Sequence, residues 1–222
     1  ALQLPIYDIW TLFSAPTTMA NVTSPAFTLE QYTNNVIFGL FPARTVYRNG
    51  VSIHSDVNLL QLPQTNNQPL RIGNTSGSVG WNLDGDIAEV IMFNNRVNTA
   101  HRYLIANYLA AKYGIALGAN EIYQMDNGVN GDYDHDVAGI GRVDANNLQL
   151  DSRGTGIVRI YNATSLGNNE FMMWGHDNDI MGTWGSVDLP PGIQGRWYRT
   201  WRVSEVNATG STAVDVGTVT ME

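Results

Sequence analysis

Three acidic residues stand just ahead of an apolar run in the stretch LDGDIAEVIMFNN, which covers residues 83–95. Sandwich glycosidases place two carboxylates on one face of a strand, about 5–5.5 Å apart, as nucleophile and general acid. Alternate strand residues share a face, so Asp84 and Asp86 fall on one face and Glu89 on the other. A shift of one residue would reverse the face. The sequence therefore predicts no acid–nucleophile pair here, and we expect the strand to be structural.

A second group of possible ligand residues lies in DNGVNGDYDHD, residues 126–136, and a second acidic turn, GHDND, covers residues 175–179. Calcium takes about six to eight oxygen ligands from carboxylates, amides and carbonyls. The spacing is not that of an EF-hand, so a solvated acidic turn is the alternative to a calcium site that stiffens the joint between domains. An approach of the two turns in the fold would favour the calcium site. The candidate calcium ligands are Asp126, Asn130, Asp132, Asp134, Asp136, Asp177 and Asp179.

The histidines give a weaker signal. His135 and His176 lie in the two acidic turns, and they form the histidine pairing of interest. No His-x-x-x-His spacing occurs, which argues against a zinc site.

Tryptophans offer a different chemistry, because exposed indole rings can stack on sugar rings. Trp184 lies in the glycine-rich turn MGTWGS and is the tryptophan that we expect to be exposed. Trp174, Trp197 and Trp201 are expected to be partly buried, since large aromatic residues usually belong to a core. Trp184 is therefore the candidate residue for carbohydrate binding.

The composition excludes several classes of protein. The 222 residues carry a formal net charge of −8, and Lys112 is the one lysine, so a nucleic-acid reader or a binder of anionic membranes is not expected. The chain has no cysteine, which excludes disulfides and thiolate metal sites, and no run of about 20 apolar residues occurs. Abundant Asn, Gly, Ser and Thr indicate turn-rich β structure, typical of an extracellular β protein.

Short apolar or alternating segments recur along the chain at roughly ten-residue spacing, which is the pattern of a β-sandwich. Asn49-Gly50 predicts a type I′ hairpin. Residues 98–114 have helical spacing, with Asn98 or Thr99 as the N-cap and Gly114 as the terminating residue, and we expect this helix to close the first unit. Both ends of the chain interrupt β patterns, so we expect a segment of a longer protein. The expected strands are residues 5–14, 26–30, 35–41, 45–47, 51–54, 70–72, 86–93, 136–142, 156–161, 170–175, 198–205 and 212–220.

The stretches YRNGV, PLRIGNTSG, LDGDIAEVIMFNN and RYLIANYLAAKYGIAL follow one another between roughly residues 30 and 118. This succession resembles the C-terminal half of a laminin-G-like, concanavalin-A-like jelly roll. In that family the final strand carries Gly-x-Ile-Ala-Glu-Val, matched here by residues 85–90. A following helix ends in Tyr-Leu-x-x-Lys-Tyr-Gly, matched by residues 108–114.

The rest of the chain, roughly residues 132 to 222, is similar to an uncharacterised β domain of large bacterial surface proteins, chiefly of Bacteroidota. The resemblance implies secretion to the cell surface and a structural or adhesive role, and it implies no reaction. The matching positions are Ala138, Gly139, Ile140, Gly141, Arg142, Asp144, Trp174, Gly175, Asp177, Asn178, Arg199, Trp201 and Val203.

These patterns predict a mainly β chain with two domains. A jelly-roll-type sandwich with one helix is expected over residues 1–118, incomplete at its N-terminus, and a second β-sandwich over residues 119–222, truncated at its C-terminus. The expected function is a non-catalytic, fibre- or adhesin-like segment of an extracellular bacterial surface protein, with other copies or segments of that protein as partners. A carbohydrate-binding module is the alternative, and a sandwich glycosidase with its acids outside these residues is a third hypothesis.

Overall fold

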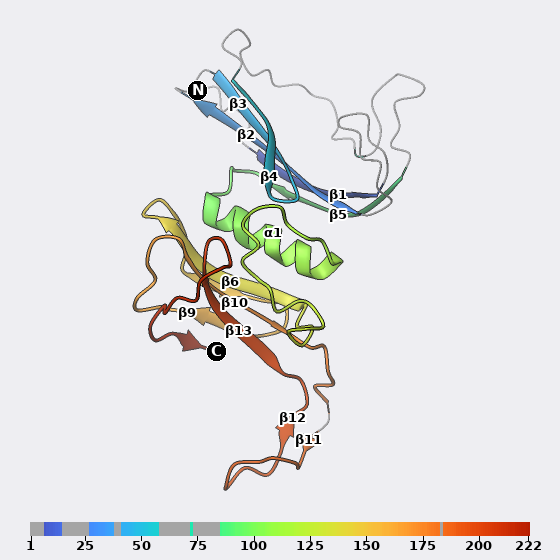
Figure 1. The fold of residues 1–222 in the computed structure, drawn as a ribbon, viewed down its shortest axis with the longest axis vertical. Helices are drawn as coiled ribbons and strands as arrows, with labels where there is room; N and C mark the ends of the chain where they lie inside the picture. The colour runs from blue at the N-terminus through green and yellow to red at the C-terminus, as the bar shows by residue number, and fades with distance from the viewer. Residues whose placement is uncertain (1–6, 15–26, 38–40, 58–71, 73–84, 183) are drawn as a thin grey trace. The chain divides into compact units, whose positions relative to one another are not determined.

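The computed structural model describes residues 7–14, 27–37, 41–57, 72, 85–182 and 184–222. It divides into two compact units, Ala1–Val97 and Asn98–Glu222. The described residues are mainly β, with antiparallel sheets and a single α-helix (Figure 1). The predicted sandwich-type, mainly β class is therefore confirmed.

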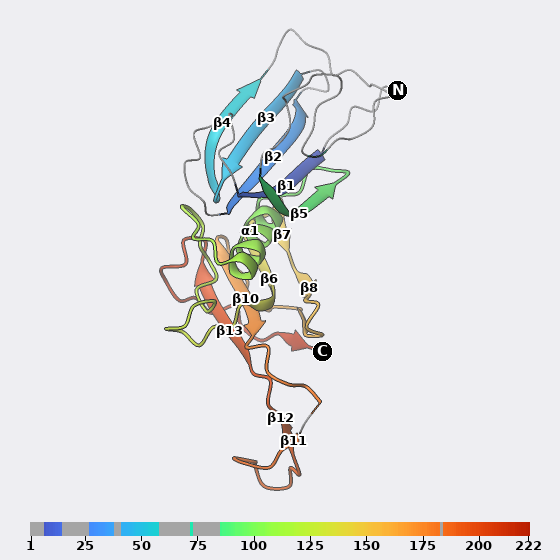
Figure 2. The same ribbon diagram turned by 90° about the vertical axis from the view of Figure 1, so that its right-hand side faces the viewer.

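The first unit contains a five-stranded sheet in the order β4-β3-β2-β1-β5, and Figure 2 shows its strands side by side. One continuous strand, β2, replaces the two strands predicted between residues 26 and 41. The strand predicted at residues 70–72 lies outside the described residues except for Ile72. The strand bounds are β1 (Tyr7–Ser14), β2 (Thr28–Ile37), β3 (Phe41–Arg48), β4 (Val51–Val57) and β5 (Asp86–Phe93).

The predicted hairpin at Asn49-Gly50 joins β3 to β4. Both residues have positive φ, 46° and 82°, as a type I′ turn requires. Asn49 is also bonded to Leu29: its main-chain N–H donates to the Leu29 carbonyl at 2.8 Å, and its side-chain oxygen accepts the Leu29 N–H at 2.9 Å. The turn residue therefore fastens the end of the hairpin to β2.

Strand β5 has the predicted alternation. Ile87, Glu89 and Ile91 are half-buried, whereas Asp86 and Ala88 are exposed. However, the pairing of β5 with β1 shifts by one residue between Ile87 and Val90, so β5 has a bulge there and its two-residue period is interrupted. The expectation that Asp86 and Glu89 point to opposite faces rested on that period, and it is not confirmed. Asp84 lies outside the described residues.

The helix α1 (Thr99–Tyr113) has the predicted ends. Asn98 caps it by accepting the N–H of His101 at 2.9 Å, and Gly114 ends it at φ 63°. The helix packs on β6 and β7, and the compact units divide between Val97 and Asn98. The predicted boundary after residue 118 is therefore wrong, since the helix belongs to the second unit. Among the described residues, no helix has the length and hydropathy needed to cross a bilayer.

The buried side chain of Asn107 on α1 binds the segment that follows the helix. Its amide nitrogen donates to the carbonyls of Tyr103 at 2.9 Å and Asn120 at 2.8 Å. Its amide oxygen accepts the N–H groups of Ile122 at 2.8 Å and Tyr123 at 2.9 Å. The segment after the helix is thus held against the helix, and Ile122 and Tyr123 are buried. A stretch that resembles a linker in the sequence is part of a core.

The second unit has a sheet of order β13-β10-β6-β7, a second sheet β14-β9-β8 and a ribbon β11-β12. Of the strand predicted over residues 212–220, only a bridge at Ala213 and the short β14 form. The bounds are β6 (His135–Asp144), β7 (Asn147–Gln149), β8 (Asp151–Arg153), β9 (Arg159–Tyr161), β10 (Glu170–His176), β11 (Trp184–Gly185), β12 (Arg196–Trp197), β13 (Trp201–Asn207) and β14 (Thr220–Met221).

Strand β10 is buried on both faces, which explains its continuous apolar sequence. Phe171 and Met173 pack in a cluster with Leu104 of α1, whereas the alternate residues Met172 and Trp174 pack in a second cluster with residues of β9. The sheet of β10 therefore lies between α1 and the second sheet. Glycine in β6 permits the close approach, because a Cβ at Gly139 would lie only 2.7 Å from Leu104 Cδ2.

Candidate functional site

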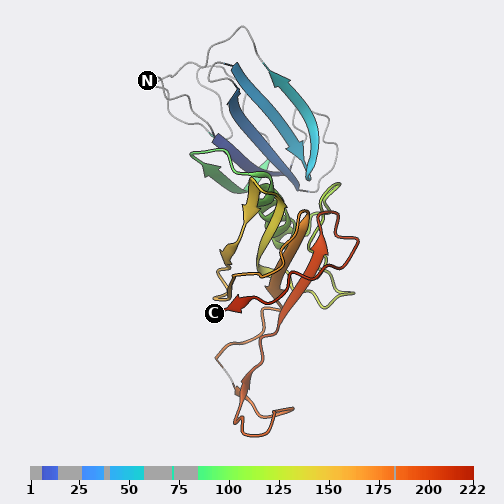
Figure 3. The same ribbon diagram turned by 90° about the vertical axis from the view of Figure 1, so that its left-hand side faces the viewer.

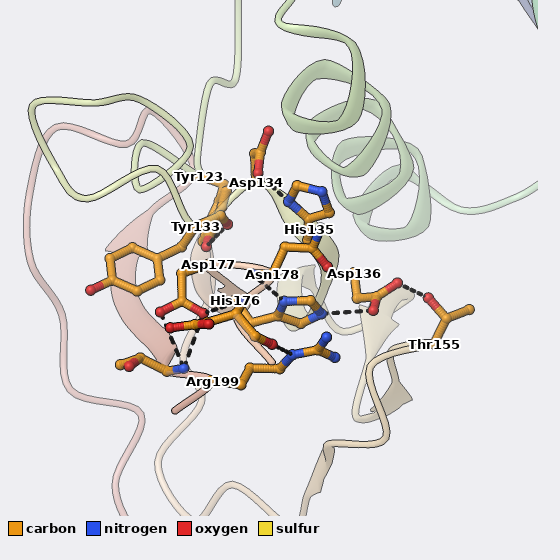
Figure 4. Close-up of polar contacts among 12 residues, drawn as sticks. Tyr123, Tyr133, Asp134, His135, Asp136, Thr155, His176, Asp177, Asn178 and Arg199 are labelled. Atoms are coloured by element: carbon orange, nitrogen blue, oxygen red, sulfur yellow. Dashed lines mark hydrogen bonds and ion pairs between the residues drawn. The ribbon is translucent and has the colours of Figure 1, made fainter. Parts of the chain in front are cut away.

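The two acidic turns meet where β6 and β10 pair. His135 lies opposite His176 across the two strands, and their rings stack with centroids 5.8 Å apart and planes inclined by 24°. Figure 4 shows Asp134, Asp136 and Asp177 of the two turns around this pair. The two acidic turns thus approach one another at this histidine pair.

His176 is the buried centre of this cluster, with 1% of its surface exposed. Its Nε2 lies 2.7 Å from Asp136 Oδ2, and its Nδ1 accepts the main-chain N–H of Asn178 at 2.9 Å. An Nδ1 that accepts a hydrogen bond carries no proton, so the proton is on Nε2 and is donated to Asp136. The edge of the ring contacts Trp201, with centroids 5.6 Å apart. Both ring nitrogens are engaged, which leaves His176 without a free nitrogen to act as a general base.

Asp136 accepts hydrogen bonds from two segments of the chain. The hydroxyl of Thr155 donates to its Oδ1 and His176 donates to its Oδ2. Burial raises the pKa of Asp136, but the two hydrogen bonds outweigh burial and the net pKa is lowered. Asp134 forms a similar pair with His135, at 2.5 Å between Oδ1 and Nδ1. The Asp136–His176 pair joins β6 to β10 and acts as a structural clamp, whereas Asp134 and His135 are consecutive residues and their contact is local.

Between β10 and β13 the chain makes a long excursion, residues 177–200. Asp177 and Asp179 at its start bind Thr200 and Arg199 at its end. Asp177 Oδ1 accepts the N–H groups of Asp179 and Thr200, each at 3.1 Å. The guanidinium Nε of Arg199 donates to the Asp179 carbonyl at 2.8 Å, and Asp179 Oδ1 accepts the N–H of Ile180 at 2.7 Å. These carboxylates are engaged by donors of the protein itself.

The remaining candidate ligands lie in the loop before β6. Asp126 is half-buried, and burial above all raises its pKa, with further contributions from the negative charges of Glu121, Asp134 and Asp132. Asn130 donates from its side chain to the Gln124 carbonyl at 2.7 Å. Asp132 adopts a left-handed conformation, at φ 59°.

All seven candidate calcium ligands lie in the described part of the chain. In that part, no three His, Asp or Glu residues are grouped so that they could hold a metal ion. The structure brings Asp136 beside His176, and the charges of Asp132 and Asp134 act on Asp126. Calcium binding stays a prediction.

The second candidate site is a hairpin at the far end of the excursion between β10 and β13, formed by β11 and β12. Figures 1 to 3 show it carried away from those two strands. Trp184 pairs with Trp197 across the ribbon, and Gly185 pairs with Arg196. Trp184 is 66% exposed, which confirms the exposure predicted from the sequence.

A tight turn lies in the segment that joins β11 to β12. The Ile193 N–H donates to the Pro190 carbonyl at 3.1 Å, and Gly192 has φ 88°. Proline followed by glycine with positive φ is the signature of a type II turn. Pro191-Gly192, with Trp-Gly before it and Gly-Arg-Trp after it, is the sequence signal that could have identified this hairpin.

Three aromatic rings form the surface of the hairpin. The rings of Trp184 and Trp197 have centroids 5.7 Å apart and planes inclined by 36°. The Tyr198 ring lies over Gly185, where a Cβ would be 3.0 Å from ring carbon Cε1. Trp184 lies against Gly195 in a similar way: a Cβ added to Gly195 would be 3.2 Å from the Cβ of Trp184. Glycines therefore allow these two side chains to rest against main chain.

The other tryptophans divide between core and surface. Trp174 is buried, and Trp201 is partly buried and packs against the cluster of β9 and β10. Trp197 is 41% exposed, so the expectation that it belongs to the core is wrong. The strand predicted over residues 198–205 begins only at Trp201, and Trp197 lies beyond it, in the hairpin.

Comparison with known proteins finds one family. Residues 101–222 match the family described as Domain of unknown function (DUF8202). No curated protein and no solved structure matches the chain. The matched residues include most of α1, the histidine cluster and the aromatic hairpin.

Proposed function

Since this chain belongs to the family described as Domain of unknown function (DUF8202), whose description assigns no activity, we propose a function from its own geometry. The chain is a non-catalytic adhesion module of an extracellular bacterial surface protein, and the aromatic hairpin is its contact surface. The cell-surface location rests on the resemblance of roughly residues 132 to 222 to domains of bacterial surface proteins.

The observation that carries this proposal is the exposure of large apolar side chains on the excursion between β10 and β13. Soluble proteins rarely expose a group of such residues unless it binds a partner. Aromatic residues are also enriched at binding surfaces, because they offer much apolar area with few rotatable bonds. The exposed residues are Ile180, Trp184, Val187, Ile193, Trp197 and Tyr198.

Two features of the described residues favour a non-catalytic role. Both ring nitrogens of His176 are hydrogen-bonded within the protein, so the most buried histidine offers no site for proton transfer. On β5, Asp86 is exposed whereas Glu89 is half-buried, so the two carboxylates differ in their access to a substrate. A glycosidase of the retaining type needs two carboxylates that face one another across the substrate.

An adhesion assay tests the proposal. The whole chain is coupled to beads, which are mixed with beads that carry further copies of the chain and, separately, with surfaces coated with polysaccharide. We expect attachment in at least one arm, and loss of attachment when Trp184, Trp197 and Tyr198 are all replaced by serine. Phe27→Ala is the matched control, because Phe27 is an exposed aromatic residue of the other unit, at 36%. Attachment in neither arm, or equal attachment by the triple variant, would exclude the hairpin as an adhesive surface.

A further inference from the structure

We propose that the aromatic hairpin is a carbohydrate-binding platform for β-linked pyranose chains, an inference that rests on the adhesion function proposed above. Pyranose units with equatorial substituents present flat faces of C–H groups. The aromatic rings of Trp184, Trp197 and Tyr198 would pack against these faces, and polar groups beside the rings would bind the hydroxyls at the sugar edge.

Two of the three aromatic side chains are supported by glycine main chain. Tyr198 rests over Gly185, and Trp184 rests over Gly195. Gly185 is buried although its neighbours in the hairpin are exposed. The contacts are made by Cε1, Cζ and Oη of Tyr198 and by Cβ and Cε3 of Trp184, and they restrict the rotamers of both side chains. The hairpin thus presents rigid, flat apolar surfaces before any ligand arrives, which reduces the entropy lost on binding.

The exposed area of the three aromatic side chains suits a small ligand. An aromatic side chain has about 200 Å² of surface, and the three rings are 66%, 41% and 47% exposed, so together they present roughly 300 Å². A stable protein–protein interface buries about 800 Å² on each partner. The ring surface is too small to form such an interface alone, but it matches one or two sugar units.

The two indole rings lie too close together to hold a ligand between them. A ligand held between two rings needs them about 7–8 Å apart, since each contact takes about 3.5–4 Å. The Trp184 and Trp197 centroids are only 5.7 Å apart. The ligand therefore packs on the outward faces of the rings and extends along the ribbon, as a linear oligosaccharide can.

The polar residues of the hairpin agree with a neutral ligand. Ser186, Asp188, Gln194 and Arg196 are exposed, and they supply hydroxyl, carboxylate, amide and guanidinium groups for sugar hydroxyls. Nucleic-acid bases also stack on aromatic rings, but their phosphates need a basic groove. The charges of Asp188 and Arg196 cancel, and the whole chain is at −8. A sugar chain is the stacking ligand that this charge distribution accepts.

The test is titration of the whole chain with soluble oligosaccharides of β-1,4-linked glucose and β-1,4-linked N-acetylglucosamine, followed by tryptophan fluorescence and isothermal calorimetry. We expect saturable binding with a change in tryptophan emission for at least one of the two. Trp184→Ala should weaken the affinity about tenfold, the loss of one aromatic contact worth roughly 1–1.5 kcal/mol, whereas Trp184→Phe retains a ring and should weaken it less.

Gly185→Ala is a second, positional variant, because its Cβ would displace the Tyr198 ring while every ring is retained. We expect reduced affinity with an unchanged unfolding midpoint. Phe27→Ala should bind as the wild type does. Unchanged affinity in both Trp184→Ala and Gly185→Ala would overturn the platform, and so would the absence of binding to either sugar.

The same samples separate this inference from the adhesion proposal. A combined variant, Ile180→Ser with Val187→Ser and Ile193→Ser, retains the rings and removes the exposed aliphatic side chains. If the wild type binds no sugar but self-associates, and this variant abolishes self-association, the hairpin binds another copy of the chain: adhesion then stands and the carbohydrate platform falls. If the wild type neither binds sugar nor self-associates, both proposals fall.

Discussion

Asp136 of β6 and His176 of β10 are joined by a hydrogen bond of 2.7 Å between Oδ2 and Nε2, and the histidine ring is almost wholly buried. Replacing Asp136 by Asn removes the charge that the Nε2–H and the Thr155 hydroxyl both recognise. We expect the variant to lose about 1–2 kcal/mol of unfolding free energy at neutral pH. Urea denaturation of wild type and variant at pH 7 measures the difference.

The same pair predicts a pH dependence. The pKa of Asp136 is lowered in the folded protein from an ordinary value of 3.8. A carboxyl whose folded-state pKa is depressed stabilises the fold above the ordinary pKa and loses this contribution as the pH falls through the folded value. The difference between wild type and Asp136→Asn should therefore be constant above about pH 5 and shrink below about pH 4. A difference that persists at the acid end would contradict this assignment.

Asp126 should behave in the opposite way. Its pKa is raised, above all by burial, so its charge opposes folding at neutral pH. Asp126→Asn is expected to stabilise the protein by about 0.5 kcal/mol at pH 7, a small gain because the group is only half-buried. The gain should fall as the pH drops through the raised pKa, since the wild-type carboxyl is then already neutral. Melting temperatures of both proteins across the acid range check the sign.

Calcium offers a separate measurement on the same acidic loop. The carboxylates of Asp134, Asp136 and Asp177 already accept hydrogen bonds within the protein. We therefore expect calcium to raise the melting temperature and protease resistance through the rest of the loop, at Asp126, Asn130 and Asp132, and a chelator to remove the gain. A rise in melting temperature with calcium that is absent in Asp126→Asn would place the ion in this loop, as the sequence first suggested.

Asn107 should be among the most sensitive polar residues of the second unit. Asn107→Ala leaves the buried N–H groups of Ile122 and Tyr123 without their acceptor. We expect a loss of about 2–4 kcal/mol, since each buried unsatisfied group costs about 1–3 kcal/mol. Chemical denaturation measures it, and Asn146→Ala, at an exposed turn position, serves as the control. An equal effect in both variants would show that the buried amide has no special role.

The turn at Asn49 allows a test confined to the first unit. Asn49→Gly keeps the positive φ but removes the acceptor of the Leu29 N–H, and we expect a loss of about 1 kcal/mol. Asn49→Val adds backbone strain of roughly 1–2 kcal/mol at the same φ. Amide hydrogen exchange at Leu29 should accelerate in the order wild type, Gly, Val. Amides of β10, in the other unit, should exchange at unchanged rates.

The features that sequence predicted well depend on residues close to one another in the chain. Asn98, Gly114, Asn49 and Gly50 determine where the helix and the hairpin begin and end through the conformations of those residues themselves. Such features need no knowledge of tertiary contacts.

The features that the sequence did not predict depend on contacts between residues far apart in the chain, or on an alternation of residues that does not belong to one continuous strand. Residues after Gly114 have the composition of a linker. In the fold they pack on the helix, where Asn107 binds the main chain of Asn120 and Ile122. Trp197 alternates with Trp201 in the sequence, which favours a partly buried position for both. The main chain leaves the sheet between them, where Asp177 binds Thr200. The partners of Asp136 are 19 and 40 residues away in the chain, and no short motif announces them.

The place of α1 within the second unit has a practical consequence for anyone who wishes to produce that unit alone. A recombinant piece starting at residue 119 would strip away the helix and leave Leu104's neighbours Phe171 and Met173 facing water, which invites aggregation. Starting at Asn98 retains the helix together with its cap. A cassette grafted onto another protein must therefore include α1 together with the strands on which it packs.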